Sequence, residues 1–225
     1  MRDAHTILVK SVPKIIDAAA QRGVKAEDLY RSVSLDPSVL NDPDNRIPFA
    51  QVVALYQEAA RLANDQDFGL HIGEASHPRL WDVLGYSFMN SATLGEAFNR
   101  LIRYLRVWTD GASHDLEIGR SVVRIEYRYH TSDYAPDARR QDCEKTFSVI
   151  VGAGRLVTGV DWSPTEVSFQ HREPESVSEH HRIFRSPVRF GMPREIMELM
   201  KLYPQPIQQS GVEFLPIDVP RPRRI

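Results

Sequence analysis

The chain has 225 residues, of which 42% are hydrophobic and 26% are charged, and its formal net charge is −2. This composition is typical of a globular protein with a real hydrophobic core, and it excludes a fibrous or disordered chain. The near-zero charge argues against a dedicated nucleic-acid binder, which usually carries an excess of basic residues. Because Cys143 is the single cysteine, an intrachain disulfide and a multi-cysteine metal site are excluded.

The sequence gives no sign of membrane insertion or export. No stretch reaches the roughly 18 consecutive apolar residues that a membrane helix needs. The N-terminal segment MRDAHTILVKSVPK carries charges where a secretory signal would have its apolar core. We therefore expect a cytoplasmic protein without membrane contacts.

The first third of the chain predicts helices. Apolar side chains recur at helical spacing between residues 7 and 21, and Gly23 ends the run. A short helix is expected over residues 26–33, and another begins at Pro48. The apolar face of this last helix consists of Phe49, Val52, Val53, Tyr56 and Ala60.

The middle of the chain contains a well-marked helix. Thr93 and Glu96 form a T-x-x-E capping box, in which each side chain accepts a hydrogen bond from an N–H of the first turn. The helix is expected to end near Asp110, with Gly111 as a left-handed cap. Its apolar stripe consists of Leu94, Phe98, Leu101, Leu105 and Trp108.

After Gly111 the apolar period changes from 3.6 to 2, which predicts a β-hairpin. Gly119-Arg120 suits a two-residue type II′ turn, which pairs residue 116 with residue 123. That register gives one apolar face and brings Asp115 close to Arg124 on the other. The apolar face consists of Leu116, Ile118, Val123, Ile125 and Tyr127.

The last third mixes helix and strand. A long helix that is apolar nearly all round is expected over 137–158, followed by a strand at 165–171. A short helix near 177–184 and a strand at 187–190 come next, and one more helix is expected over 193–201.

Together these elements predict an α+β fold, with N-terminal helices packed on a small antiparallel sheet that a long buried helix crosses. We expect one domain over residues 1–192, with a helical part at 1–111 and the sheet and long helix at 112–192. Residues 193–225 hold six of the 15 prolines and are expected to form a proline-rich tail.

Catalytic and metal-binding motifs are not found. There is no P-loop, no G-x-S-x-G and no H-E-x-x-H, and no G-x-G-x-x-G follows a strand. Glu179, His180 and His181 are adjacent on one helix and point in different directions, which disfavours a metal site. Cys143 lies on an apolar helix face, where a buried, inert thiol is expected. We therefore expect a protein that is not an enzyme and has no cofactor.

The aromatic residues permit two interpretations. They form the core joint between helices and sheet, or they line a cavity for a small ligand with both apolar and polar parts. Arg103 and Arg106 lie beside this set and favour an acidic group on such a ligand. Phe88 and Phe147 complete the aromatic set. The candidate ligand-binding residues are Trp81, Tyr86, Tyr104, Trp108, Tyr127 and Tyr129.

Four segments of the chain carry a family resemblance. The first is LGYSFMNSATLGEAFNRLIRYLRVWTDG at 84–111. The others are DFGLHIGE at 67–74, PTEVSFQHREP at 164–174 and HHRIFRSPVRFG at 180–191. In order and spacing they resemble the N-terminal sensor domain of AraC-type transcriptional regulators, in the subgroup of the ornithine-utilisation regulators. The resemblance covers about residues 5–191.

The resemblance implies that the chain binds a small-molecule effector, forms a homodimer and thereby controls transcription. DNA would be contacted only through a helix-turn-helix domain that is missing from this chain, because 33 proline-rich residues follow position 192. The chain is then either the sensing part of such a regulator or a natural sensor without a reader.

Two alternatives remain open at this point. One is a dimerisation or protein-interaction module with a filled core and no ligand. The other is a haem-based nitric-oxide sensor, which the order of helices and sheet also resembles. That class holds its haem propionates with Y-x-S-x-R, which this sequence lacks.

Overall fold

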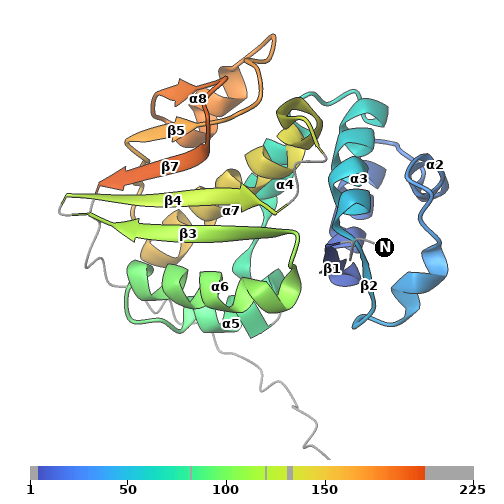
Figure 1. Ribbon diagram of the computed structural model, residues 1–225, viewed down its shortest axis with the longest axis horizontal. Helices are drawn as coiled ribbons and strands as arrows, with labels where there is room; N and C mark the ends of the chain where they lie inside the picture. The colour runs from blue at the N-terminus through green and yellow to red at the C-terminus, as the bar shows by residue number, and fades with distance from the viewer. Residues whose placement is uncertain (1–4, 82, 120, 131–133, 201–225) are drawn as a thin grey trace, which may run out of the picture.

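The computed structural model describes residues 5–81, 83–119, 121–130 and 134–200, and these residues form an α+β fold as predicted. Figure 1 shows the N-terminal helices on one side of a twisted sheet and the helices of the chain's middle along the sheet's β3 edge. Among the described residues, no helix is long and apolar enough to cross a membrane.

The N-terminal part packs around helix α3, which spans Phe49–Leu62. Helix α1 (Val12–Ala20) and α3 are both amphipathic and bury their apolar faces against each other, which confirms the spacing argument. Two short strands pair antiparallel beside them. The remaining elements of this part are β1 (Thr6–Leu8), the 3₁₀ turns η1 (Val9–Ser11) and η2 (Pro37–Asn41), α2 (Ala26–Ser32) and β2 (Arg46–Pro48).

Helix α7 (Arg140–Thr158) is the buried centre of the molecule, as expected, and it follows the 3₁₀ turn η4 (Pro136–Arg139). Its closest neighbour is α4 (Phe68–Ala75), whose Gly69 and Gly73 lie directly against the α7 surface. A side chain at either glycine would overlap atoms of α7, so the two glycines set the short distance between these helices.

The capping box on α6 (Leu94–Trp108) is confirmed, because Thr93 Oγ1 accepts a hydrogen bond from the Glu96 N–H at 3.2 Å. The expected end is wrong: α6 stops at Trp108, and Gly111 does not adopt the left-handed conformation. Gly111 is needed for another reason, since a Cβ there would lie 2.3 Å from the ring of Phe49. Helix α6 pairs with α5 (Val83–Met89), which follows the turn η3 (Pro78–Trp81).

The hairpin of β3 (Ala112–Ile118) and β4 (Val122–Tyr129) forms, but its register differs from the prediction by two residues. Leu116 pairs with Ile125, and Glu117, rather than Asp115, lies opposite Arg124. A shift of two residues keeps every side chain on its expected face, so the apolar alternation cannot distinguish the two registers.

The expected helix over 193–201 is wrong, because residues Glu195–Met200 form strand β7. This strand lies in the middle of the sheet, between β4 and β5 (Glu166–Ser168), and pairs antiparallel with both. Glu, Met and Leu favour a helix intrinsically, but here pairing with two neighbours and burial of Met197 override that preference. The sheet therefore continues past residue 192.

The sheet has the order β3-β4-β7-β5-β6 and is antiparallel except for β5 and β6 (Val188–Arg189), which run parallel. Helix α8 (Ser178–Phe184) connects these last two strands. Helix α7 crosses the sheet, where the ring centroid of Phe147 lies 5.6 Å from that of Phe169, next to β5. Both rings are fully buried, which places the core at this crossing.

Candidate functional site

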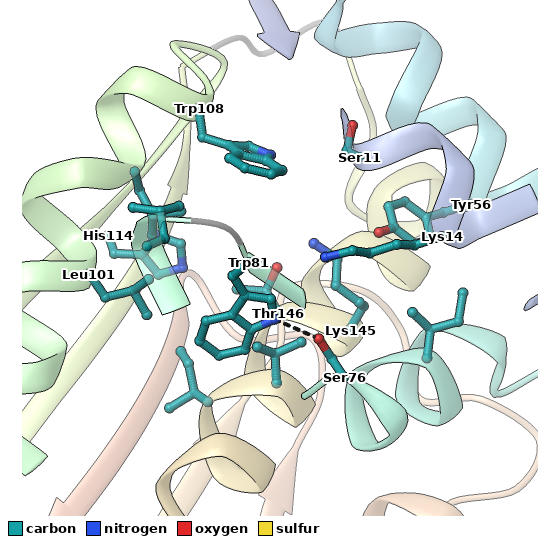
Figure 2. A pocket seen from close by; sticks show the side chains of 15 residues that line it. Ser11, Lys14, Tyr56, Ser76, Trp81, Leu101, Trp108, His114, Lys145 and Thr146 are labelled. Atoms are coloured by element: carbon teal, nitrogen blue, oxygen red, sulfur yellow. Dashed lines mark hydrogen bonds between the residues drawn. The ribbon is translucent and has the colours of Figure 1, made fainter. Parts of the chain in front are cut away.

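A cavity of about 170 Å³ lies where α6 faces α7 and the first strand of the hairpin. Figure 2 shows side chains from several helices and from strand β3 converging on it. Its lining residues are Ser11, Lys14, Tyr56, Ile72, Ser76, Trp81, Leu84, Leu101, Leu105, Trp108, His114, Lys145, Thr146, Val149 and Ile150.

Two tryptophans form the aromatic part of the wall. Trp81 packs edge-on against Phe88, and its indole N–H donates a hydrogen bond to Ser76 Oγ at 2.8 Å. Trp108, the last residue of α6, is half-buried, and its indole has no hydrogen-bond partner among the described residues. Trp81 is therefore fixed in place, whereas the indole N–H of Trp108 is available to a ligand.

A buried carboxylate lies beside the cavity. It belongs to Asp142 of α7, whose side chain is only 2% exposed. Its Oδ2 accepts hydrogen bonds from the hydroxyls of Tyr127 and Tyr129, both at 2.9 Å. Its Oδ1 lies 3.2 Å from the Lys145 Nζ, one helical turn along. Burial and the neighbouring Asp142 raise the pKa of both tyrosines well above the usual value, so both phenols stay protonated and donate.

Lys145 is the central cation of the site. Burial acts to lower its pKa, but Tyr56 and Asp142 more than compensate, and the net pKa is raised. The ammonium group also lies 5.1 Å from the centre of the Tyr56 ring. Lys145 is therefore positively charged at neutral pH, at the edge of the cavity.

His114 faces the cavity from β3 and stacks on Tyr127, with 4.7 Å between ring centroids. Burial, helped by the charge of Lys145, lowers its pKa to about 4. The imidazole is therefore neutral at pH 7, with one donor and one acceptor nitrogen. Neither nitrogen has a hydrogen-bond partner among the described residues.

A further cavity of about 120 Å³ adjoins the first beneath the N-terminal helices. It shares Tyr56, Trp108, His114 and Lys145 with the larger cavity, and Asp142 also lines it. Because they share these lining residues, we refer to the two adjoining cavities together as the hollow and to each of them as a lobe; their lining residues extend from α6 to Phe49 at the start of α3.

The structure brings three of the candidate residues to this hollow: Trp81 and Trp108 line the larger lobe, and Tyr127 lines the smaller. Tyr129 lies behind them on Asp142. Tyr86 and Tyr104 are 50% and 45% exposed and line neither lobe, and the candidate arginines Arg103 and Arg106 also lie exposed on α6. Phe88 and Phe147 are fully buried core residues.

The sequence-based prediction missed the polar residues of the site, although two of them left a signal. Asp142 and Lys145 are charged residues one turn apart in a helix predicted to be buried, where unpaired charges are costly. His114 falls two residues before Leu116 and therefore on the apolar face of its strand. Tyr56 was assigned only to the core face of its helix, which it does occupy.

A separate polar cluster lies under α8. His180 Nε2 is 2.7 Å from Glu144 Oε1, and Asp67 lies close enough for the three to hold a metal ion. However, the guanidinium of Arg140 already contacts both carboxylates, at 2.8 Å and 3.0 Å. His181 is exposed and contributes nothing to this cluster.

The comparisons with known proteins agree with this fold. The family model of the arabinose-binding domain of AraC transcription regulators, N-terminal, matches residues 23–202. The chain belongs to this family. Its relatives are regulators of transcription rather than enzymes.

Individual relatives of this AraC-type domain are distant. The ornithine utilization regulator of Pseudomonas aeruginosa is 24% identical over 190 residues, which cover 84% of this chain and 56% of that protein. An uncharacterized HTH-type transcriptional regulator of Mycobacterium tuberculosis is 26% identical over 96 residues, or 42% of this chain and 28% of that protein.

The crystal structure of the transcriptional regulator CdpR from Pseudomonas aeruginosa has the same fold, with a TM-score of 0.61 at 14% identity. The match covers 87% of this chain and 56% of CdpR. The AraC-type domain thus spans little more than half the length of these two regulators.

Proposed function

We propose that this chain is the effector-sensing domain of an AraC-type transcriptional regulator and that the effector binds in the hollow between α6, α7 and β3. The observation that carries the proposal is the combination of aromatic walls with unpaired polar groups, the Trp108 indole and the His114 imidazole. Sites for small molecules have this composition: apolar surface for affinity and a few polar groups for orientation.

Effector binding would act on the position of α6. This helix supplies Leu101, Leu105 and Trp108 to one wall, and α7 supplies the opposite wall. A ligand that contacts both helices stabilises the arrangement that holds them at the correct spacing. The larger population of this helix arrangement would then change the activity of a helix-turn-helix domain that contacts DNA.

A homodimer is part of the proposal, and the outer surface of the α5–α6 pair supports it. Val83 of α5 and Val107 of α6 are 74% and 68% exposed, and Tyr86 and Tyr104 of the same two helices are 50% and 45% exposed. Apolar side chains grouped on a surface are typical of contact sites. Val107→Asp is expected to shift the mass measured by light scattering from dimer to monomer.

The competing function is a dimerisation module that binds no ligand. A hollow that the protein's own side chains do not fill favours the sensor, because a purely structural domain gains stability by filling its core.

The test is a thermal-melt screen of the wild-type chain against a metabolite panel, followed by Trp fluorescence titration of each hit. Leu101→Trp fills the hollow and is expected to abolish the melting shift caused by any hit. Val107→Leu, on the outer face of the same helix, is the matched control and is expected to retain it. Hits whose shift survives in Leu101→Trp bind elsewhere and would contradict the proposed site.

A further inference from the structure

The charged groups that line the hollow already interact within the protein. The Lys145 ammonium lies 3.2 Å from Asp142 Oδ1, and the side chain of Asp142 is only 2% exposed. Two phenol hydroxyls donate to the other oxygen of this carboxylate. Lys14 of α1 donates a hydrogen bond from its Nζ to the Leu80 carbonyl at 2.5 Å and has a further interaction besides. Among the described lining residues, each charged group is therefore engaged before a ligand enters.

A charged ligand would have to compete with these interactions. A carboxylate that binds Lys145 competes with Asp142 for the ammonium group, and a ligand ammonium that binds Asp142 competes with Lys145 and the two phenols. In both cases the ligand gives up its hydration while a buried charge of the protein loses its partner, which is strongly unfavourable. The hollow consequently disfavours ligands of either charge.

Two neutral polar groups, by contrast, have no hydrogen-bond partner among the described residues. The indole N–H of Trp108 is a donor only. The imidazole of His114 is neutral, because burial and the charge of Lys145 lower its pKa to about 4, and it has one donor and one acceptor nitrogen. Both residues line both lobes, and Figure 2 shows both rings facing the hollow. A ligand group that both accepts and donates, such as a hydroxyl or an amide, matches this pair.

The apolar part of the larger lobe limits the size of the ligand. Its volume of about 170 Å³ is close to that of an apolar cavity of about 150 Å³, which takes up one benzene molecule. Trp81, Leu101 and Leu105 offer it flat and branched apolar surface. A single ring, or a branched chain of similar size, fits this part.

Building on the proposed function, we propose that the effector is an uncharged small molecule with one ring or branched apolar body and one hydroxyl or amide group. The polar group forms hydrogen bonds with the Trp108 indole and the His114 imidazole. The apolar body lies against Trp81 and Leu101. Carboxylates, amines and zwitterionic amino acids are poor effectors, because their charges find no free partner in the hollow.

The first experiment uses the wild-type chain and probes of matched shape. Benzamide is paired with the anion benzoate, and benzyl alcohol with benzylamine, which is a cation at neutral pH; toluene lacks the polar group. Calorimetric titration at neutral pH is expected to show each uncharged polar probe binding at least about tenfold more tightly than its charged partner. Benzyl alcohol is expected to bind several-fold more tightly than toluene. Benzoate or benzylamine that binds in the hollow as tightly as its uncharged partner would overturn the ligand class.

The second experiment locates the polar contact. The chain has three tryptophans, Trp81, Trp108 and Trp162, so their indole N–H signals can be followed by NMR in a ¹⁵N-labelled sample, and Trp108→Phe identifies one of them. Benzyl alcohol is expected to shift the Trp108 signal more than toluene does, because the indole N–H gains an acceptor. Trp162 lines neither lobe and serves as the internal control. Equal shifts with the two probes would contradict the hydrogen bond to Trp108.

The third experiment tests His114. His114→Phe keeps an aromatic ring against Tyr127 but removes both ring nitrogens, so it is expected to lose most of the preference for benzyl alcohol over toluene. His114→Gln regains a donor and an acceptor and is expected to recover part of that preference. His181→Gln, at an exposed histidine of α8, is the matched control and is expected to change neither affinity. Toluene binding shows that each variant is folded; the full preference retained in a folded His114→Phe would overturn the role of His114.

The two proposals fail in different ways. Charged and uncharged probes that bind equally, with both lost in Leu101→Trp, refute the uncharged ligand and keep a sensing site. If none of the probes binds, this ligand class is refuted, and the metabolite screen decides separately whether the hollow senses another compound.

Discussion

Substitution of Gly69 by alanine tests the close approach of α4 and α7. A Cβ at this position would lie 2.1 Å from the backbone oxygen of Gln141, where ordinary van der Waals contact begins near 3.4 Å. The obstacle is backbone of the central helix, so relief requires one helix to move rather than a side chain to rotate. Overpacking of this kind costs about 1–3 kcal/mol.

Two further contributions determine the net change in the free energy of unfolding of Gly69→Ala. The shift would disturb the buried hydrogen bond from the Gly69 N–H to Gln141 Oε1, now 2.6 Å, which contributes about 1 kcal/mol. The higher helix propensity of alanine, compared with glycine, offsets up to about 1 kcal/mol of this loss. The net loss in the free energy of unfolding is therefore about 1–3 kcal/mol, which lowers the melting temperature of a domain of this size by roughly 2–12 °C.

Thermal and urea unfolding followed by circular dichroism measure this loss. Gly152→Ala is the matched control, because it lies on α7 facing the same helix, yet its nearest atom, the Glu74 carbonyl oxygen, would be 3.7 Å from the new Cβ. That variant is expected to gain up to about 1 kcal/mol. If Gly69→Ala is as stable as the wild type, the two helices do not approach as closely as described.

The remaining predictions concern the core and its titration. Phe98→Ala is expected to cost about 3–5 kcal/mol in urea unfolding, because the ring is buried, whereas Leu101→Ala is expected to cost no more than about 2 kcal/mol because Leu101 borders a cavity. An equal cost would mean that the cavity is filled. Burial raises the pKa of Glu195 to about 7. Between about pH 4.5 and pH 7, the Glu195 carboxyl group therefore keeps its proton in the folded chain and loses it in the unfolded chain. Between pH 4.5 and 7 the free energy of unfolding of the wild type should therefore fall by up to about 3 kcal/mol relative to that of Glu195→Gln. If the free energies of unfolding of the two proteins change with pH in parallel, the carboxyl group of Glu195 is not buried.

Local patterns in the sequence predicted local structure well. The capping box at Thr93 fixed the start of α6, because it depends on residues three positions apart. The alternation of apolar and polar residues around Ile125 predicted the hairpin and its apolar face, but it did not predict which residues pair across the two strands. Strand β7 was missed because its conformation depends on two neighbours that are remote in the chain, and no short-range pattern encodes them.

For the candidate site, too, the residues close together in sequence were predicted, and those brought together by packing of remote segments were not. Trp108 and Tyr127 were predicted to meet if α6 covers the hairpin, and both border the smaller lobe. The charges of the site were sought on the arginines of α6, next to the aromatics in sequence, and instead come from Lys145 and Lys14. These lysines approach the tryptophans only through the packing of α7 and α1.

The central position of β7 also determines when the domain can fold. Val123 pairs with Leu199, and Val167 pairs with Met197, so β7 is the element that joins the two halves of the sheet. During synthesis, β3 and β4 can form their hairpin early, but the edge of β4 stays without a partner until residues 195–200 emerge from the ribosome. Pairing over such long sequence distances is slow, and an open strand edge invites association with other chains. The nascent chain is therefore most prone to aggregate just before its last described strand arrives.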